Sequence, residues 1–570
     1  MVEIPVSPSD TSSAASDKPK RSASLLVAVG ILFSRLAGLI RGAVFNGFLG
    51  VGGANDSFVL ATRVPNVLQM LLGEGTLSAS FIPVYSNELE RDEEEAGRIA
   101  GAIASLLALV AAVVVILSVI FARQIGWVIM RGNVDDPRFD LMVSLLRITF
   151  PSAGLLVLSA WCLGILNSHR QFFLSYVAPV LWNIAQISAV AGGVLFFGLG
   201  DTTGISADEL ADAATNIEVL GEVADIAAWG FLAGSALQFL VQVPNVRRLA
   251  RGLKFSLDLK REGAREVLRR FLGAVSGRGV IQISAFVDTI LAAAIVAGGA
   301  TALGNAQLLY ILPISLFAVS IAASELPELS RLTDPEDIRK RGEAGFAQIA
   351  FFVSFTATAY ILLGDKIVAT LFERGLFGPD ETLLVWFTLG TYAFGLIPSA
   401  ISRLTQNTLW SQGDTNGPAK VAVVRVIVAI VVAIIAMQLF DRIAASDIRD
   451  IAPTLFDPGT RNPELRFGAM GITLGSAVAA WIEAILLWRL ADKAIPGVSP
   501  LRPIKALIPA LVGAGLVALV MRVVTDDMWP PLAMVLSVGL SGITYLVIAW
   551  FQRIPALNVL LVGPLKPLRR

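Results

Sequence analysis

Long apolar runs follow one another along almost the whole chain, and no other feature of the sequence restricts its fold as strictly. A helix needs about 20 apolar residues to cross a hydrocarbon core that is roughly 30 Å thick. None of the runs alternates with the period of two residues that the strands of a membrane barrel require. We therefore predict an all-α integral membrane protein with about 14 transmembrane helices, at residues 23–49, 57–85, 99–122, 139–166, 171–198, 223–245, 271–297, 303–329, 345–372, 380–410, 418–440, 467–490, 503–524 and 529–551.

The composition narrows the range of functions. With 55% hydrophobic and only 16% charged residues, the chain lies well outside the usual composition of soluble domains. Its formal net charge is zero, so the overall charge gives no indication of a nucleic-acid partner. A single cysteine, Cys162, and a single histidine, His169, offer no residue set for a metal cluster or a nucleophilic triad. We expect no cofactor and no enzymatic activity.

The loops that would face one side of the membrane are far more basic than those on the other. Of the 45 Lys and Arg residues, 28 lie in the tails and alternate loops on the side of both termini, and 10 lie in the opposite loops. Residues 247–270 hold nine of them, whereas residues 199–222 hold none. Because basic loops stay in the cytoplasm, we predict a multi-pass protein of the cytoplasmic (inner) membrane with both termini in the cytoplasm.

Two short segments repeat at almost the same spacing. "ASFIPVYS", at residues 79–86, matches "ASELPELS", at residues 323–330, with an offset of 244 residues. Ser159-Ala160, Asn167 and Pro179 return as Ser399-Ala400, Asn407 and Pro418, with offsets of 239 or 240. Two matches in register predict two pseudo-symmetric six-helix lobes plus two C-terminal helices, the arrangement of transporters that bind substrate between their halves. We predict six parts: a disordered cytoplasmic tail (1–22), an N-lobe (23–245), a basic linker (246–270), a C-lobe (271–491), a pair of further helices (492–553) and a cytoplasmic tail (554–570). Within the linker, residues 255–270 are predicted to form an interfacial helix.

Charged residues at membrane depth are the second unusual feature. A charge at the bilayer centre costs roughly 2.5–3.5 kcal/mol on insertion scales, so most such residues should face a wet or protein-lined interior. The spacing of Asp56, Arg63 and Glu74 places them on one stripe of the second span, which Pro65 should disturb. The arginines within predicted spans are Arg35, Arg41, Arg63, Arg147, Arg278, Arg403 and Arg425.

Arg35 and Arg41 are the strongest candidates for a binding role. They are six residues apart, which is about 120° around a helix and about 9 Å along it, so they border one cleft. The first span contains no acid that could neutralise them, and guanidinium groups match phosphate through bidentate hydrogen bonds. For Arg63, ion pairing with Asp56 or Glu74 is an equally good interpretation.

The N-terminal half resembles a known family. The segments "FSRLAGLIR", "GGANDSFVLATRVPNVLQMLLGEGTLSASFIPVYS" and "LLRITFP" are similar to those of the MurJ/MviN lipid II flippases of the MOP exporter superfamily. This resemblance implies a bacterial transporter that moves undecaprenyl-diphosphate-linked peptidoglycan precursor from the inner to the outer leaflet by alternating access. It implies lipid II, membrane lipids and cell-wall synthesis proteins as partners. It places Arg35, Arg41, Asp56 and Glu74 among the residues that face the headgroup.

The sequence departs from the family pattern at several positions. Gln69 and Leu308 stand where the resemblance leads us to expect arginines, and Gln307 stands where it leads us to expect an acid. Other arginines could restore positive charge to the cavity, namely Arg63, Arg278 and Arg403. Asp288 resembles an acid of a sodium site in some relatives, although the eleventh span lacks the Asn or Asp partners of that site.

The sequence leaves alternatives open for both the function and its energy source. A flippase for another lipid-linked oligosaccharide would share the diphosphate that the arginines fit. A non-transporting membrane scaffold derived from a flippase would account for the missing arginines. Transport could be coupled to the membrane potential or to a monovalent cation at Asp288.

Overall fold

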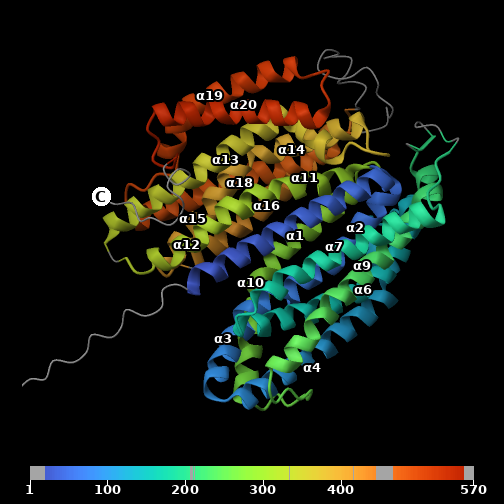
Figure 1. The fold of residues 1–570 in the computed structure, drawn as a ribbon, viewed down its shortest axis with the longest axis vertical. Helices are drawn as coiled ribbons and strands as arrows, with labels where there is room; N and C mark the ends of the chain where they lie inside the picture. Colours follow the sequence, from blue (N-terminus) through green and yellow to red (C-terminus); the bar gives the residue numbers. More distant parts are fainter. Residues whose placement is uncertain are drawn as a thin grey trace, which may run out of the picture.

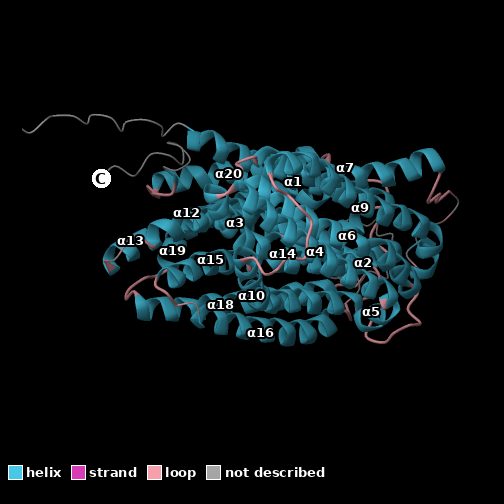
Figure 2. Cartoon of the chain, turned by 90° about the horizontal axis from the view of Figure 1, so that it is seen from below, coloured by secondary structure: helices cyan, strands magenta, loops and turns pink. Residues whose placement is uncertain are grey.

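The chain folds into a bundle of long helices (Figure 1). The computed structural model describes residues 19–203, 205, 209–210, 212–332, 334–414, 416–443 and 466–557. Within these ranges the helices are joined by loops and there is no strand (Figure 2). Twelve helical stretches of the described chain are long and apolar enough to cross a membrane, which confirms the all-α membrane fold. Helices α1 and α10, which cover the predicted first and seventh spans, are not among those twelve, so fourteen crossings stay a prediction.

The first half of the chain supplies the blue to green helices of Figure 1, and the second half supplies the yellow to red ones. The helices of the first half are α1 (Pro19–Leu49), α2 (Gly53–Leu72), α3 (Glu74–Arg91), α4 (Glu93–Ile120), α5 (Ala122–Ile129), α6 (Arg138–Ser168), α7 (Phe172–Phe197) and α9 (Ala213–Leu249). The helices of the second half are α10 (Glu262–Ala293), α11 (Gly299–Pro313), the π-helix η1 (Ile314–Val319), α12 (Ser320–Leu329), α13 (Pro335–Phe372), α14 (Pro379–Phe394), α15 (Leu396–Ser411), α16 (Asn416–Phe440), α18 (Gly468–Ala494), α19 (Leu501–Val524) and α20 (Pro530–Phe551).

The second predicted span of each half is broken at the corresponding position. Gly73 separates α2 from α3, and the π-helix η1 separates α11 from α12. The repeat offset of 244 carries Gly73 onto Phe317, which lies within η1. The helix continues through Pro65, contrary to the prediction that this residue disturbs it. Because the break falls at Gly73 instead, Glu74 begins a new helix and does not lie on one continuous helix with Asp56 and Arg63.

The two halves meet along a small set of helices. Helix α2 packs against both α10 and α11, and α1 packs against α13 and α11 as well as against α7. Helices α19 and α20 pack on α13 at the edge of the second half, around Phe351 and Tyr545. Helix α3 also packs against α10, so the contact between the halves is formed mainly by α1, α2 and α3 from the first half and by α10, α11 and α13 from the second.

The basic linker is held against the start of α4. Residues 250–261 form a loop and α10 begins at Glu262, so the interfacial helix predicted over 255–270 does not exist as a separate element. A Cβ on Gly97 or Gly101 of α4 would overlap the carbonyl oxygens of Arg251 and Lys254, so the linker backbone lies directly on these glycines. Ion pairs from Arg251 to Glu93 and from Arg261 to Glu95 hold the same segment. We call the end of the bundle that carries this linker the basic end, and the opposite end the far end.

We predict that Gly97→Ala destabilises the protein, whereas Gly192→Ala does not. The added methyl group of Gly97→Ala meets the backbone of Arg251, and such overpacking costs about 1–3 kcal/mol. A Cβ on Gly192, within α7, has open space around it, and alanine is the better helix former by up to about 1 kcal/mol. Thermal unfolding of the purified variants checks this; equal midpoints for both would contradict the close backbone contact.

Candidate functional site

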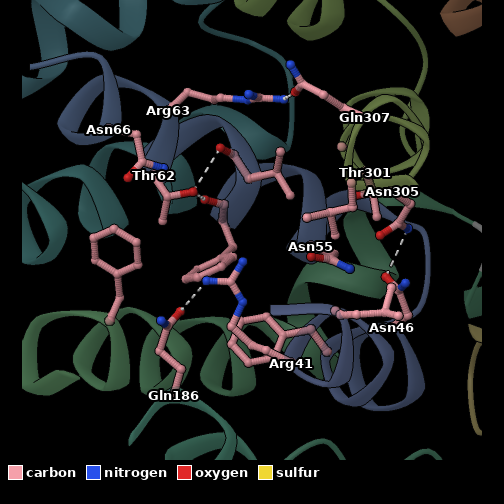
Figure 3. Close-up of a pocket in the computed structure, with 18 of the residues that line it drawn as sticks. Arg41, Asn46, Asn55, Thr62, Arg63, Asn66, Gln186, Thr301, Asn305 and Gln307 are labelled. Carbon is pink, nitrogen blue, oxygen red and sulfur yellow. Dashed lines mark hydrogen bonds between the residues drawn. The ribbon is translucent and has the colours of Figure 1, made fainter. Parts of the chain in front are cut away.

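A cavity of about 300 Å³ lies between the two halves, with its walls formed mainly by α1, α2, α7 and α11 (Figure 3). Three arginines face it, and every other polar side chain in its lining is an uncharged Asn, Gln or Thr. No Asp or Glu is found among these lining residues. The charged and polar ones are Arg35, Arg41, Asn46, Asn55, Thr62, Arg63, Asn66, Gln186, Thr301, Asn305 and Gln307.

Arg41 points from α1 into the cavity (Figure 3). Its Nη1 donates to Oε1 of Gln186 over 3.4 Å, and its guanidinium lies over the ring of Trp182, 5.1 Å from the centroid. Both partners come from α7, and a cation–π contact of this kind holds the guanidinium plane without neutralising it. Since none of the described carboxylates forms an ion pair with Arg41, its positive charge is left for a ligand.

Arg63 lies where the two halves meet. Its Nη2 donates to Oε1 of Gln307 over 2.6 Å, across the contact between α2 and α11. Residues 63 and 307 are 244 positions apart, which is the offset of the sequence repeat, so each is the counterpart of the other. A residue that contacts its own counterpart must lie next to the pseudo-two-fold axis. The cavity therefore adjoins that axis, with most of its lining supplied by the first half.

Arg35 is exposed and lines the same cavity nearer the start of α1. Met70 of α2 is another exposed lining residue, with 56% of its surface accessible. Because both side chains lie toward the basic end, the cavity is most accessible from there. The structure thus brings Arg35, Arg41 and Arg63 together. Leu308, where the resemblance leads us to expect an arginine, also lines the cavity and brings no charge to its wall.

Asp56 does not line the cavity. Its carboxylate is fully buried at the far end and accepts a hydrogen bond from Arg138 Nη1 at 3.2 Å. It also accepts bonds from the backbone N–H of Gly298 at 2.9 Å, and from the N–H and hydroxyl of Thr301 at 2.8 and 2.7 Å. The proposed pairing of Asp56 with Arg63 is wrong, because the N-terminus of α11 and Arg138 take all of its hydrogen-bonding capacity.

Arg138 extends this contact between the halves. Its Nη2 donates to the carbonyl oxygens of Ala293 and Ile295, at the end of α10, and its guanidinium also pairs with Asp136 over 2.7 Å. We call this set of contacts around Asp56 and Arg138 the far-end latch. It ties α2 and α6 of the first half to the turn between α10 and α11 of the second half.

A second contact closes the far end beside the latch. The loop between α13 and α14 lies on the end of α1, where the N–H of Leu376 donates to the carbonyl oxygen of Gly47 over 2.9 Å. Gly375 has a φ of 60° and its Cα lies against Gly47, so no side chain fits there. These backbone contacts, together with the far-end latch, close the cavity at the far end.

The remaining candidate residues lie elsewhere. The side chains of Glu74 and Arg278 fall outside the described residues. Arg403 is exposed on α15 and does not line the cavity. Asp288 faces a second cavity of about 30 Å³, which it shares with Thr289, Gln307, Tyr392 and Arg63.

Two further arginines within spans have roles that need no ligand. Arg425 forms an ion pair with Glu483 over 2.9 Å, and Glu483 also accepts a bond from Gln406. Arg147 is exposed on α6 and lies outside the cavity lining. Only the arginines of α1 and α2 therefore bring charge into the larger cavity among the described side chains.

Sequence reasoning missed the uncharged half of the site. The sequence drew attention to charges, and it gave no reason to single out Gln186, Asn46 or Asn305 within apolar helices. Gln307 stood out only as a departure from the family pattern, although the repeat offset, which makes it the counterpart of Arg63, could have identified its contact. Arg138 lies at the edge of a predicted span, where a structural arginine cannot be told from a loop residue.

Comparisons with known proteins agree on one family. A family model described as lipid II flippase MurJ matches residues 45–446. A probable lipid II flippase MurJ of Rhizobium tropici is 28% identical over 469 residues, which cover 80% of this chain and 78% of that protein. A counterpart from Aquifex aeolicus is 29% identical over 402 residues, which cover 70% of this chain and 74% of that protein.

Solved structures show the same fold. A lipid II flippase MurJ in an inward closed conformation superposes with a TM-score of 0.71 at 22% identity, covering 93% of this chain and 99% of the other. An inward-facing MATE-family multidrug transporter of the MOP superfamily gives a TM-score of 0.61 at 16% identity, covering 84% of this chain and 98% of the other. The arrangement of helices is therefore the one seen in these two transporter structures.

We predict that Arg138→Met destabilises the protein more than the double variant Asp56→Asn/Arg138→Met does. Removing Arg138 alone leaves a buried carboxylate without a counter-charge, which costs about 3–5 kcal/mol, and neutralising the acid relieves part of that cost. Denaturant unfolding of the three proteins measures the difference. Arg123→Met is the control, because the pair of Arg123 with Asp140 is exposed and contributes about 0–1 kcal/mol. A double variant less stable than Arg138→Met would contradict the latch.

Proposed function

The chain belongs to the family of MurJ lipid II flippases, and on that premise we propose that it carries lipid II from the inner to the outer leaflet of a bacterial cytoplasmic membrane. Such a transporter moves its cargo without making or breaking a covalent bond. The single observation that carries the proposal is the cavity between the halves, whose described lining residues include Arg35, Arg41 and Arg63 but no Asp or Glu. A diphosphate supplies the negative charge that this lining lacks.

Arg41 and Arg63 are placed to hold the diphosphate. Each is already oriented by an amide, from Gln186 and Gln307 respectively, and neither amide competes with an anion for the positive charge. Guanidinium groups bind phosphate oxygens through paired hydrogen bonds. Arg35 lies nearer the accessible end, so it is the first of the three arginines that the entering diphosphate contacts. The polyprenyl tail stays in the lipid.

Release requires the far end to open. With the basic end in the cytoplasm, the structure is closed toward the outside by the far-end latch and by the loop on α1. Opening must break the hydrogen bonds that join Asp56 to α11 and that join Arg138 to α10. The latch is therefore closed when the substrate is loaded and must open before the substrate is released.

We propose that the membrane potential, rather than a bound cation, drives the cycle. Asp288 shares its small cavity with Arg63, whose positive charge opposes a cation in the same space. One elementary charge crossing a potential of 100 mV corresponds to about 2.3 kcal/mol. Arg41, which forms no ion pair with any described carboxylate, gives that potential a charge on which to act.

We predict that Arg41→Ala and Arg63→Ala each reduce lipid II translocation by about tenfold or more, since one charge-assisted hydrogen bond contributes about 1.5–3 kcal/mol. Translocation into proteoliposomes containing the purified protein measures this. The matched control is Arg147→Ala, which removes an exposed arginine outside the cavity. Wild-type rates in both cavity variants would contradict the proposal.

Transport measurements in the same proteoliposomes distinguish the proposed function from the two alternatives. A flippase for another lipid-linked oligosaccharide would move that lipid faster than lipid II, and a scaffold would move neither. We predict faster movement of lipid II than of a polyprenyl-diphosphate-linked oligosaccharide without a peptide.

We predict that the basic end faces the cytoplasm. In a Cys162→Ser background, Thr203→Cys lies in an exposed far-end loop and Ser256→Cys lies in the basic linker. A membrane-impermeant maleimide applied to spheroplasts should label the first variant and not the second until the membrane is permeabilised. The reverse labelling pattern would contradict the orientation.

A further inference from the structure

Four of the eight uncharged Asn, Gln and Thr side chains that line the cavity lie toward its far end. Asn46 lies near the end of α1, Asn55 near the start of α2, and Thr301 and Asn305 near the start of α11. Figure 3 shows these four on one side of the cavity, away from Arg63. Asn46 follows Arg41 by five residues, which is about 7.5 Å along the helix. A layer lined by these side chains thus lies between Arg41 and the far end of the cavity.

One donor in this layer has no protein acceptor. Asn305 Nδ2 donates to Asn46 Oδ1 over 3.1 Å across the two halves, which fixes the orientation of the Asn46 amide. The Nδ2 of Asn46 is then left without a partner, although only 2% of the residue is exposed. Asn55 is already engaged, since its Nδ2 donates to the carbonyl oxygen of Gly50 over 2.6 Å. A buried donor without an acceptor carries a desolvation cost that a ligand oxygen removes.

We propose that Asn46 and Asn305 form a subsite for a neutral oxygen, the hydroxyl or acetamido carbonyl of the sugar attached to the diphosphate. This inference rests on the proposed function and adds the part of the headgroup that the arginines do not bind. A neutral amide donor is sufficient for a neutral acceptor, whereas a phosphate is held better by the guanidinium group of Arg41, a turn and a half away. The order along α1 is then diphosphate at Arg41 and first sugar at Asn46.

The subsite also adjoins the far-end latch. Thr301 lines the cavity and donates its hydroxyl to Asp56, and Asn55 is the residue before Asp56 in the chain. A sugar bound to Asn46 therefore lies at the end of the cavity that must open for release. This is the order in which a headgroup entering from the basic end would be arranged, with its lipid-linked phosphates last.

The test compares two lipids on the full-length protein. The probes are polyprenyl diphosphate and polyprenyl diphosphate carrying one N-acetylated sugar, mixed in equal amounts and measured by native mass spectrometry. We expect the wild-type protein to prefer the glycosylated lipid by about fivefold, as one or two neutral hydrogen bonds provide. Asn46→Leu and Asn305→Leu should each abolish that preference while binding of the sugar-free lipid is unchanged, which also shows that the variants are folded.

Asn133→Leu is the control, because Asn133 is an exposed asparagine in the loop between α5 and α6 and does not line the cavity. It should retain the preference. An unchanged preference in both subsite variants would mean that Asn46 faces only water, and would overturn the inference. Equal binding of both lipids by the wild-type protein would overturn the subsite and leave the proposed function standing. Binding of neither lipid would overturn both.

Discussion

Positive charge without a counter-ion, held inside a membrane bundle, is the constraint on which the rest of the structure depends. Each centrally placed guanidinium costs roughly 2.5–3.5 kcal/mol on insertion scales, so the chain must provide it with a polar environment. Here that environment is an indole ring and neutral amides, which orient Arg41 and Arg63, while Asp288 faces Arg63 only from the adjoining small cavity. A carboxylate in the same place would stabilise the empty protein and compete with an anionic cargo.

The separation of acids from cations gives the two ends of the cavity different roles. Asp56, the acid nearest the site in sequence, binds the N-terminus of α11 and Arg138 instead of a cavity arginine. The two halves also differ in charge where they meet at the pseudo-two-fold axis. Identical residues at both positions would place two guanidinium groups face to face, whereas Arg63 opposite Gln307 gives one charge and one acceptor. Departure from symmetry thus occurs where exact symmetry would bring like charges together.

The sequence predicted the helical bundle and the repeat well, because apolar run length and helical spacing are local properties. It also placed Arg35 and Arg41 on one cleft, since both lie on a single unbroken helix. It could not predict the partner of Asp56, because Arg138 and the start of α11 reach it only through packing of distant segments. Nor could it predict the break at Gly73, where Pro65 seemed the better candidate, or the orientation of Asn46, which is set by Asn305 from the other half.

The central claim, that the arginines between the halves are unpaired because the cargo brings the phosphates, is tested most directly by a structure of the protein with lipid II bound. The account predicts phosphate density within hydrogen-bonding distance of the guanidinium groups of Arg41 and Arg63, with the tail outside the bundle. Phosphates bound elsewhere, with those two arginines still on Gln186 and Gln307 alone, would contradict it.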